Sequence, residues 1–372
     1  MLVRDFDFAL PPELIAQEPP AERTAARMLH LDRTTGAVRH THVTALPELL
    51  RAGDLLVANN TRVFPARLLG RRVPTGGAVE CLLIRSVSDA DQISSRSAAG
   101  ADQMSSRSGA GSGQVSWEAL VHPGQKLKPG ARVVFEGVRT IYGEILERRF
   151  FGRRTIRLWT DDGSPVDEAV DAIGHMPLPP YIKRDDRPED RARYQTIFAH
   201  ERGSVAAPTA GLHFTPPLLD ALRRRGVEIA EVTLHVGYGT FQPVRVDRVE
   251  DHRLDPEPYE ITQTTAAAVN RALADGRRVI AVGTTTTRTL EAVALANNGR
   301  MVAGSGWTDL FIAPGFAFKV IGGLVTNFHL PQSSLLMLVA ALAGRDRVLS
   351  AYSAAIAERY RFYSYGDAML VL

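Results

Sequence analysis

Short apolar runs that end in polar or glycine-bearing segments recur along the chain. In the clearest cases, Leu55–Ala58 is followed by NNTR, Val232–Val236 by GYGTF and Arg278–Val282 by GTTTTR. A fourth run, Leu324–His329, itself ends in polar residues. A continuous apolar run of roughly four to eight residues is typical of a strand that is buried on both faces. Because ligands of α/β folds gather at the carboxyl ends of such strands, we expect these polar segments to wall one pocket.

Three segments have the marks of helices. Thr215 is placed to cap a leucine-bearing helix that ends at Gly226, and Pro216 suits its first position. Leu335–Ala343 is apolar throughout and is predicted to be a helix, and Thr289–Ala296 is predicted to be a helix that follows GTTTTR. Strands that alternate with helices in this way favour an α/β fold.

Additional strands are predicted near both ends of the chain. Arg27–Asp32 and Arg39–Val43 flank a Thr-Gly turn and are predicted to pair with each other. Asp309–Ile312 is predicted to be a strand, and the aromatic tail that starts at Tyr360 is predicted to enter the core as the final strand. Both ends of the chain are therefore assigned to the α/β part of the fold.

The middle of the chain has a different sequence pattern. Six short β-rich runs lie within about 63–159, and turns bearing proline or glycine separate them without intervening helices, as in a small closed β-barrel. The prediction is a mixed α/β main domain, formed by residues 1–62 and 160–372, with the barrel inserted at 63–159. A tandem repeat at 90–111 lacks the apolar content of a core, so about 88–114 is predicted to be a disordered loop.

Composition narrows the class of protein. The 372 residues, 45% hydrophobic and 23% charged, are an ordinary globular mixture and are numerous enough for two domains. The single cysteine, Cys81, allows no internal disulfide, which fits a reducing cytoplasm and excludes a cysteine-rich zinc site. No signal peptide or membrane span is expected, and His40 and His42 lack a third metal ligand. A net charge of +3 permits a nucleic-acid partner.

The stretch Gly203–Phe214, GSVAAPTAGLHF, carries the most distinctive candidate chemistry. Its residues are small and almost uncharged, and only His213 titrates near neutral pH. Small side chains let a backbone approach a ligand closely, Ser204 and Thr209 add hydroxyl groups, and the helix that follows presents its N-terminus. The stretch is therefore predicted to contact a polar or anionic ligand. The alternative is a tight buried loop that is kept small for packing.

Several long motifs, taken in order, resemble one known family. They are MPLPPYI, RYQTIFA, GSVAAPTAGLHF, TLHVGYGTF, AVGTTTTRTLE, TNFHLP and YRFYSYGDAML. Together with LPPELIA and VANNTRVFPARL near the N-terminus, they resemble the S-adenosylmethionine:tRNA ribosyltransferase-isomerases of queuosine biosynthesis. The resemblance spans nearly the whole chain, and only the repeat at 90–111 lies outside the pattern.

The resemblance implies an α/β domain with an inserted β-barrel, a cytoplasmic location and a specific reaction. Such enzymes transfer and isomerise the ribosyl part of S-adenosylmethionine onto the 7-aminomethyl group of 7-deazaguanine, at the wobble position of a tRNA with a GUN-type anticodon. The products are epoxyqueuosine-tRNA, adenine and methionine. S-adenosylmethionine is consumed as a substrate, so no metal or other cofactor is expected. A monomer is compatible with the sequence, which leaves the oligomeric state open.

The implied reaction needs a general base, a hydrogen-bond donor for the departing adenine and a site that excludes water. We hypothesise that His213 is the base or proton shuttle. His235 and His329 compete for this role, since each also lies at the end of a candidate strand. The alternative for each histidine is a purely structural role.

Residue type and position suggest the remaining roles. The candidate substrate contacts are Asn60, Arg62, Tyr181, Tyr194, Ser204, Thr209, Gly211, Phe214, Thr284, Thr285, Arg288 and Asn327. Among them, Thr284, Thr285 and Arg288 are assigned to the methionine carboxylate or the ribose, and the aromatic rings to stacking on bases. The candidate contacts to tRNA phosphates are Arg184, Arg187 and Arg191. Phosphate contacts predict strongly salt-dependent tRNA binding.

Two alternatives from other classes remain open. An S-adenosylmethionine-dependent RNA methyltransferase would need a glycine-rich turn between a strand and a helix. The match at Gly109–Gly113 begins inside the repeat and has neither a strand before it nor a helix after it. A non-catalytic tRNA-binding protein built around the barrel would bind RNA without consuming S-adenosylmethionine. Release of free adenine distinguishes the ribosyltransferase from both alternatives.

Overall fold

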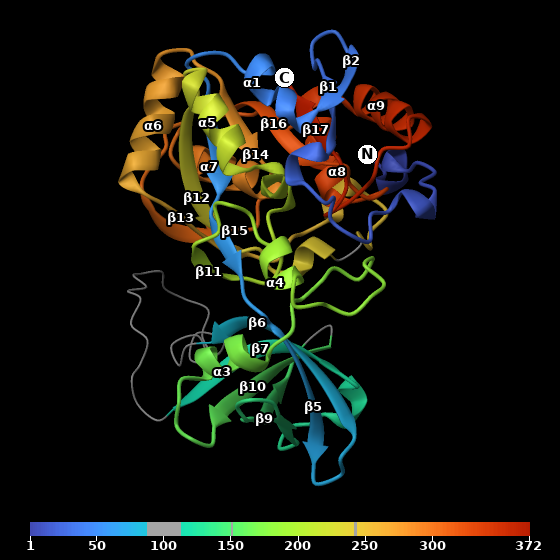
Figure 1. The fold of residues 1–372 in the computed structure, drawn as a ribbon, viewed down its shortest axis with the longest axis vertical. Coiled ribbons are helices and arrows are strands. Elements are labelled where there is room, and N and C mark those ends of the chain that lie inside the picture. The colour runs from blue at the N-terminus through green and yellow to red at the C-terminus, as the bar shows by residue number, and fades with distance from the viewer. Residues whose placement is uncertain (88–112, 150–151, 242–243) are drawn as a thin grey trace. The chain divides into compact units, whose positions relative to one another are not determined.

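The chain forms two compact units in the computed structural model shown in Figure 1. The structure describes residues 1–87, 113–149, 152–241 and 244–372. The first unit, here called the sheet unit, comprises Met1–Val63 and Leu178–Leu372, and the second, the barrel unit, comprises Phe64–Pro177. The repeat at 90–111, predicted to be a disordered loop, lies outside the described residues.

A nine-stranded mixed sheet organises the sheet unit. Its order is β15 (Gly304–Thr308), β13 (Glu257–Ile261), β12 (Glu228–Leu234), β3 (Leu55–Asn59), β14 (Val279–Val282), β16 (Ile321–Asn327), β17 (Ala368–Val371), β1 (Arg27–Leu31) and β2 (Val38–His42). Strands β12, β3, β14 and β16 are parallel neighbours, so their carboxyl ends lie at one edge. Strands β4 (Thr61–Val63) and β11 (Glu201–Ser204) pair separately.

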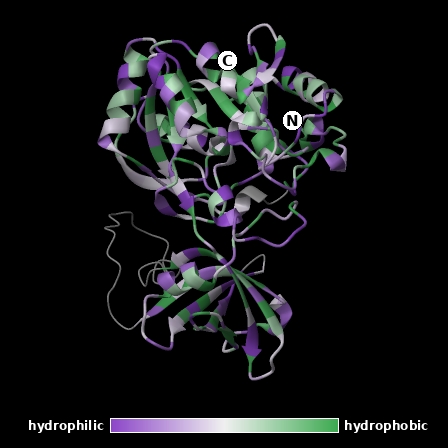
Figure 2. Cartoon of the chain, viewed as in Figure 1, coloured by the Kyte–Doolittle hydropathy of each residue, from purple (hydrophilic) through white to green (hydrophobic). Residues whose placement is uncertain are grey.

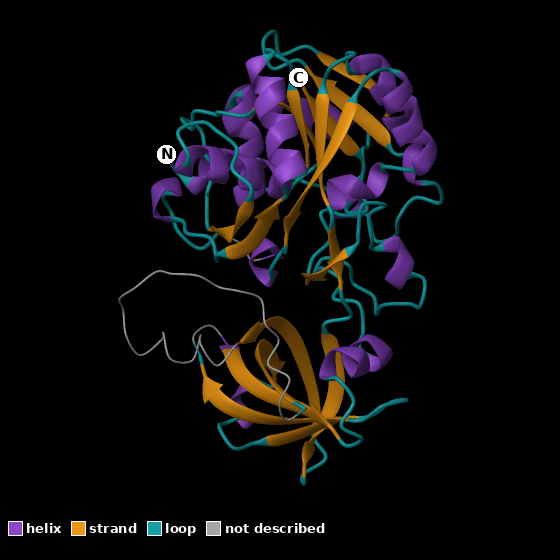
Figure 3. Cartoon of the chain, turned by 90° about the vertical axis from the view of Figure 1, so that its left-hand side faces the viewer, coloured by secondary structure: helices purple, strands orange, loops and turns teal. Residues whose placement is uncertain are grey.

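Helices cover both faces of this sheet, as Figure 3 shows for the sheet unit. On one face lie α6 (Gln263–Ala274), α7 (Thr284–Ala296), α8 (Ser334–Ala343) and α9 (Arg345–Ala357); on the other lie α1 (Leu46–Leu49) and α5 (Pro216–Arg224). Successive strand side chains point to opposite faces, so Leu55 and Val57 join the first core while Leu56 and Ala58 join the second. Hydrophobic residues accordingly concentrate on these strands in Figure 2.

The order of the strands creates a switch point beside β3. The chain that leaves β3 returns to β12 through α5, which packs on one face of the sheet. The chain that leaves β14 enters α7, which packs on the other face. Neighbouring strands whose connections go to opposite faces leave a crevice between their carboxyl ends, and α/β proteins bind ligands there.

The barrel unit is a closed six-stranded barrel. Its strands are β5 (Arg67–Val73), β6 (Ala78–Val87), β7 (Gln114–His122), β8 (Arg132–Phe135), β9 (Ile141–Arg148) and β10 (Arg153–Thr160), closed in the order β10-β7-β6-β5-β8-β9. The predicted fold class, a mixed α/β domain with an inserted closed β-barrel, is confirmed. The unit extends to Pro177 instead of ending at residue 159, because helix α3 (Val166–Ile173) packs against β9 and β10 and His175 pairs with Arg67.

Several predicted elements agree with the structure. Strands β1 and β2 pair antiparallel, helix α8 occupies the apolar segment before Gly344, and the hydroxyl of Thr215 caps α5 by accepting a hydrogen bond from the backbone N–H of Leu218. No helix in the described part of the chain is long and apolar enough to cross a membrane.

Three predictions of secondary structure were wrong: where α7 begins, whether 309–312 form a strand, and where the final strand begins. Helix α7 begins at Thr284 instead of Thr289, because the threonine hydroxyls of its first turns donate to carbonyl groups four residues back and can therefore be buried. Residues 309–312 form no strand, since the backbone of Leu310 bonds to the side chains of Thr308 and Arg288. The final strand is β17; before it, Phe362 forms a single β-bridge with Ile15, and Tyr363 and Tyr365 lie in a bend and a turn.

A further short α-helix, α4 (Asp190–Arg193), lies between the barrel unit and β11 in sequence. The stretch that prompted the site prediction folds as the end of β11, a loop, and a 3₁₀ helix at Thr209–His213. It delivers Thr209 and Ala210 to the carboxyl edge of the sheet immediately before α5 begins.

Candidate active site

A cavity lies at the carboxyl ends of β14 and β16 within the sheet unit. Its walls come from segments 207–210, 283–285, 326–330 and 363–364, joined by Tyr181. Four stretches far apart in sequence therefore meet at the carboxyl edge of the sheet, close to the switch point beside β3. This space is called the main cavity below.

Two helix N-termini face the main cavity. Gly283, with φ of +90°, turns the chain from β14 into α7 so that Thr284 and Thr285 line the wall. Ser333 lines another wall and caps α8 by accepting from the backbone N–H of Leu336. The first turn of a helix has unpaired backbone N–H groups and the positive end of the helix dipole, so both termini favour an anionic group.

Aromatic rings form the opposite part of the lining. The rings of Tyr181 and Tyr363 lie 4.6 Å apart between centroids, and the Tyr181 hydroxyl hydrogen-bonds the Ser364 hydroxyl. Burial raises the pKa of Tyr181 to about 12, so its hydroxyl stays protonated at neutral pH. Tyr363 has φ of +72°, a left-handed conformation that is strained for a bulky residue. Its carbonyl accepts from the side-chain amide of Asn327, which holds it there.

Among the three candidate histidines, His329 lines the main cavity. Its Nε2 lies 2.7 Å from the hydroxyl oxygen of Thr326, and its backbone N–H donates to the hydroxyl of Tyr352. Burial lowers the pKa of His329 to about 3, so the imidazole is neutral at physiological pH. A neutral imidazole in a buried wall can accept a proton from a bound substrate.

His213 lies instead in a second, smaller cavity. Its Nε2 is 3.2 Å from the side-chain nitrogen of Asn327, whose oxygen accepts from the Thr209 hydroxyl. Burial, and then the positive charge of Arg23, lower the pKa of His213 to about 4. His213 is therefore a neutral hydrogen-bond acceptor behind the wall of the main cavity.

His235 occupies a third environment. Its Nδ1 lies 2.8 Å from the Thr61 hydroxyl, and burial lowers its pKa. The ring packs against Gly203, where an added Cβ would come within 2.6 Å of Nδ1, so only glycine fits. The next residue, Val236, lines the main cavity. His235 thus supports the wall from behind.

Several predicted substrate contacts are buried in the surrounding fold. The Ser204 hydroxyl, fully buried, accepts from the backbone N–H of Val236 and bonds the Thr61 hydroxyl. Asn60 accepts from Thr233 and donates to Glu231, which ties β3 to β12.

Two aromatic residues and one glycine that were also predicted to contact substrate are likewise buried in the fold. Phe214 packs against Phe198 in the core, Tyr194 is buried against Tyr365, and Gly211 packs against Thr196. These residues set the shape of the walls and are absent from the lining of the main cavity. Arg62, on β4, is exposed.

Arg288 forms a buried ion pair. Its guanidinium lies 2.5 Å from the Glu257 carboxylate, and both side chains are less than a tenth exposed. Glu257 also accepts from the backbone N–H of Gly237. Glu291, three residues further along α7, does not pair with Arg288 and accepts from the backbone N–H groups of residues 319–321. The charge of Arg288 is therefore compensated within the fold.

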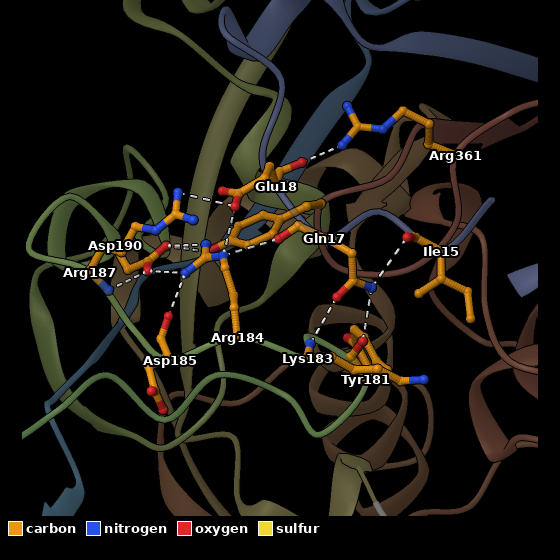
Figure 4. Close-up of polar contacts among 11 residues, drawn as sticks. Ile15, Gln17, Glu18, Tyr181, Lys183, Arg184, Asp185, Arg187, Asp190 and Arg361 are labelled. Atoms are coloured by element: carbon orange, nitrogen blue, oxygen red, sulfur yellow. Dashed lines mark hydrogen bonds and ion pairs between the residues drawn. The ribbon is translucent and has the colours of Figure 1, made fainter. Parts of the chain in front are cut away.

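The three arginines assigned to tRNA phosphates differ in their surroundings, as Figure 4 shows for two of them. Arg184 donates to Asp190 at 2.7 and 2.9 Å, pairs with Glu18, and is only 14% exposed. The hydrogen bonds that Arg184 donates to Asp190 raise the pKa of its guanidinium. Arg187 is 59% exposed and pairs with Glu18 at 3.2 Å, and Arg191 is exposed on α4. Arg184 thus serves the local structure, and Arg187 and Arg191 face solvent.

Sequence reasoning missed several residues of the two cavities. Thr326, Tyr363 and Ser364 lie inside the motifs TNFHLP and YRFYSYGDAML, but none of the three was among the predicted site residues. Arg23 and Arg193 line the second cavity although 170 positions separate them in the sequence (193 − 23). Position 193 begins the RYQTIFA motif, which was the available signal.

The described residues contain no group of three or more histidine, cysteine, aspartate or glutamate side chains placed to hold a metal ion. The expectation that the reaction needs no metal stays a prediction.

An α/β fold with an inserted β-barrel, whose main cavity holds two helix N-termini and a neutral histidine at the carboxyl edge of the sheet, is typical of enzymes that bind a small molecule at this edge. The sequence profile of the family described as "Queuosine biosynthesis protein" matches residues 3–371. The chain belongs to this family, as the motifs predicted.

Full-length relatives agree with this assignment. The chain is 50% identical over 372 residues to the S-adenosylmethionine:tRNA ribosyltransferase-isomerase of Desulfitobacterium hafniense and 48% identical over 373 residues to that of Heliobacterium modesticaldum, with all of each chain covered. The crystal structure of S-adenosylmethionine tRNA ribosyltransferase from Thermotoga maritima is 36% identical, with a TM-score of 0.52, covering 99% of this chain and 100% of that chain. The prediction of an enzyme of this family is confirmed.

Proposed function

We propose that the chain transfers and isomerises the ribosyl part of S-adenosylmethionine onto the 7-aminomethyl group of 7-deazaguanine in tRNA, releasing adenine and methionine. The names of full-length relatives at 48–50% identity support the reaction. The observation that carries it in this chain is the main cavity, where helix N-termini, aromatic rings and His329 meet. A methyl transfer would leave the ribosyl group and adenine joined.

The lining of the main cavity matches the parts of S-adenosylmethionine. The methionine carboxylate suits the N-terminus of α7, where Thr284 and Thr285 offer backbone N–H groups and hydroxyls. The sulfonium cation suits the faces of Tyr181 and Tyr363, because aromatic faces attract cations. Small residues at 207–210 leave room for the sugar.

His329 is proposed as the general base. The sulfonium acidifies the adjacent C5′–H bond, and a neutral imidazole can take that proton. The same proton can pass to adenine as the bond between adenine and the sugar breaks. The aminomethyl nitrogen then forms a bond to the altered sugar and loses a proton, and methionine leaves as the epoxide closes. His329 is the candidate base because it lines the cavity while its low pKa keeps it unprotonated.

Burial of the site protects the reactive intermediates. Thr326, Asn327 and Phe328 are all less than a tenth exposed. A wall of this kind limits the access of water, which would otherwise quench a carbanion-like species or hydrolyse the sugar.

The direct test is incubation of the protein with S-adenosylmethionine and tRNA that bears 7-aminomethyl-7-deazaguanine. We expect free adenine, free methionine and a modified nucleoside detected by mass spectrometry. The matched control is the same tRNA with guanine at the wobble position, which should give none of these. S-adenosylhomocysteine would identify a methyltransferase. RNA binding without adenine release would identify a non-catalytic binder, and either result overturns the proposal.

The proposal carries three secondary expectations. S-adenosylmethionine is consumed as a substrate and no cofactor is required, so activity should survive dialysis against a chelator. The enzyme is placed in the cytoplasm, where its tRNA substrate is available. A monomer is expected to be sufficient for turnover.

A further inference from the structure

The second cavity has features that the proposed reaction at the main cavity does not use. It is lined by Pro19, Pro20, Arg23, Arg193, Leu212, His213 and the residues 364–366. It adjoins the main cavity, because Ser364 lines both and the Asn327–His213 hydrogen bond connects their walls. It is called the arginine cavity below.

Two guanidinium groups in the arginine cavity lack a carboxylate partner. Arg23 donates to the carbonyl oxygens of Leu212 and Ala192, and Arg193 donates to those of Pro20 and Ala21. Within the described part of the chain, neither side chain lies within 4.0 Å of a carboxylate oxygen. Carbonyl oxygens orient the two groups but do not neutralise them.

The neighbouring carboxylates are already engaged. Asp190, which accepts from Tyr365 at the edge of the arginine cavity, pairs with Arg184. Glu18, directly before Pro19, pairs with Arg184 and Arg187. Two acidic and two basic side chains therefore cancel one another, as Figure 4 shows, and the charges of Arg23 and Arg193 remain in excess.

The two excess charges also repel each other. Burial and then the positive charge of Arg193 lower the pKa of Arg23, and burial and then the positive charge of Arg23 lower the pKa of His213. Like charges in a half-buried cavity are unfavourable unless an anion offsets them. Guanidinium groups bind phosphate oxygens through paired hydrogen bonds, so an oxyanion is the ligand that this arrangement fits.

We propose that the arginine cavity binds a backbone phosphate of the RNA substrate, next to the nucleotide whose base enters the main cavity. This inference rests on the proposed function. A phosphodiester is favoured over the carboxylate of S-adenosylmethionine, because the N-terminus of α7 already offers a carboxylate site in the main cavity. Adjacent cavities allow the base and its phosphate to be held separately, which fits a nucleotide turned out of the anticodon loop.

The test measures RNA binding without turnover. An anticodon stem-loop RNA is labelled with fluorescein and titrated with wild-type protein, Arg23→Gln, Arg193→Gln and the control Arg300→Gln, which alters an exposed arginine on the loop after α7. We expect each cavity variant to weaken binding about tenfold, as loss of a charge-assisted hydrogen bond does. The slope of log K against log[salt] should fall by about one. Affinity for S-adenosylmethionine, measured by calorimetry, should stay within about threefold.

A second arm locates the phosphate. Stem-loops are prepared with a single neutral methylphosphonate at successive backbone positions. At one position near the wobble nucleotide, the methylphosphonate should lower the affinity of wild-type protein about tenfold. The same substitution should cause no further loss of affinity in Arg193→Gln, because the contact to that phosphate is already absent. Methylphosphonate effects that add to the Arg193→Gln effect at every position would overturn the inference. So would cavity variants that bind RNA as wild type does, or that lose S-adenosylmethionine affinity instead.

The two proposals fail in different ways. If wild-type protein does not bind the stem-loop and releases no adenine, the proposed function itself fails. If wild-type protein binds and reacts but the arginine variants behave like Arg300→Gln, only the phosphate site fails. Arg23→Lys, which keeps the charge but loses the fork of donors, controls for misfolding and should recover part of the lost affinity.

Discussion

The side-chain nitrogen of Asn327 lies 3.2 Å from Nε2 of His213. Because an amide nitrogen can only donate, His213 accepts through Nε2 and carries its proton on Nδ1. The amide oxygen of Asn327 accepts from Thr209, and its nitrogen also donates to the carbonyl of Tyr363. One amide therefore fixes the tautomer of a histidine in the arginine cavity and the strained backbone of a tyrosine in the main cavity.

Asn327→Asp should raise the pKa of His213. An aspartate cannot donate to Nε2, so the hydrogen bond reforms only if His213 is protonated, and the negative charge favours that form. We expect the pKa to rise from about 4 to at least its ordinary value of about 6.5. Nitrogen-15 NMR of the imidazole during a pH titration measures the shift. The exposed control Asn298→Asp should leave the pKa of His213 unchanged, and an unshifted pKa in Asn327→Asp would contradict the assigned donor.

His329→Ala should lower kcat about 10²–10⁴-fold, the usual contribution of a general base, while S-adenosylmethionine binding changes much less. His213→Ala should have a smaller effect on kcat, since His213 lies behind the wall of the main cavity. His42→Ala, on exposed β2, is the control. Single-turnover adenine release measures the chemical step. Near-normal turnover in His329→Ala would remove this residue from the role.

The pH profile gives an independent check on the same residue. Burial lowers the pKa of His329 to about 3, so the base is unprotonated throughout the range from pH 5.5 to 8. We therefore expect kcat to show no inflection near pH 6.5, where an ordinary histidine would titrate. A clear acidic limb centred near 6.5 would point to a histidine outside the two buried environments.

The large elements of the sheet unit could be predicted because their cause is local. Leu55–Ala58 is apolar throughout, and Thr215 is followed by proline and leucines, so strand and cap were readable from sequence. The side of the sheet to which a given side chain points was harder to predict. Asn59 donates to Thr285 behind the main cavity, whereas Asn60, one position on, points toward Thr233. A strand reverses its side chains at every residue, so one position decides the role.

Roles that depend on distant partners could not be predicted. Arg288 looked available for a ligand, but Glu257 neutralises it from another strand. Arg184 lay in a charged run that suggested RNA contact, but Asp190 and Glu18 engage it. Conversely, the sequence does not reveal that Arg193 and Arg23 share one cavity, where their two positive charges repel each other. Sequence shows which residues are charged, and tertiary structure shows which charges are compensated.

Stability should fall as the pH drops below about 6.5, because His213 and His329 are buried in neutral form. Their pKa values in the folded state, about 4 and about 3, lie below the unfolded value of about 6.5. Between the folded and unfolded pKa values the unfolded state binds more protons. The contribution is therefore complete above pH 6.5 and is lost as the pH falls toward 4 for His213 and toward 3 for His329. Each histidine should cost roughly 2 kcal/mol at pH 5, since each pH unit is worth about 1.4 kcal/mol.

Guanidinium chloride unfolding of the S-adenosylmethionine-free protein at pH 7 and pH 5 measures this loss. The double variant His213→Gln with His329→Gln is the comparison. It should be less stable at pH 7 but should lose about 4 kcal/mol less between the two pH values than wild type. Equal losses in the two proteins would show that other groups govern the acid response.

Glu257→Gln should destabilise the sheet unit by about 3–5 kcal/mol, the usual cost of leaving a buried charge without its partner. Arg288 and Glu257 are only 6% and 7% exposed, so water cannot replace the lost carboxylate charge. Asp220→Asn, which removes an exposed ion pair with Arg223 on α5, should cost less than about 1 kcal/mol. Chemical denaturation at pH 7 compares the two variants.

Replacing both partners by Glu257→Gln with Arg288→Met should recover part of the loss, because the unpaired charge is then absent. A Glu257→Gln variant as stable as Asp220→Asn would mean that the carbonyl oxygen of Leu310, which accepts from Arg288, suffices to stabilise the guanidinium.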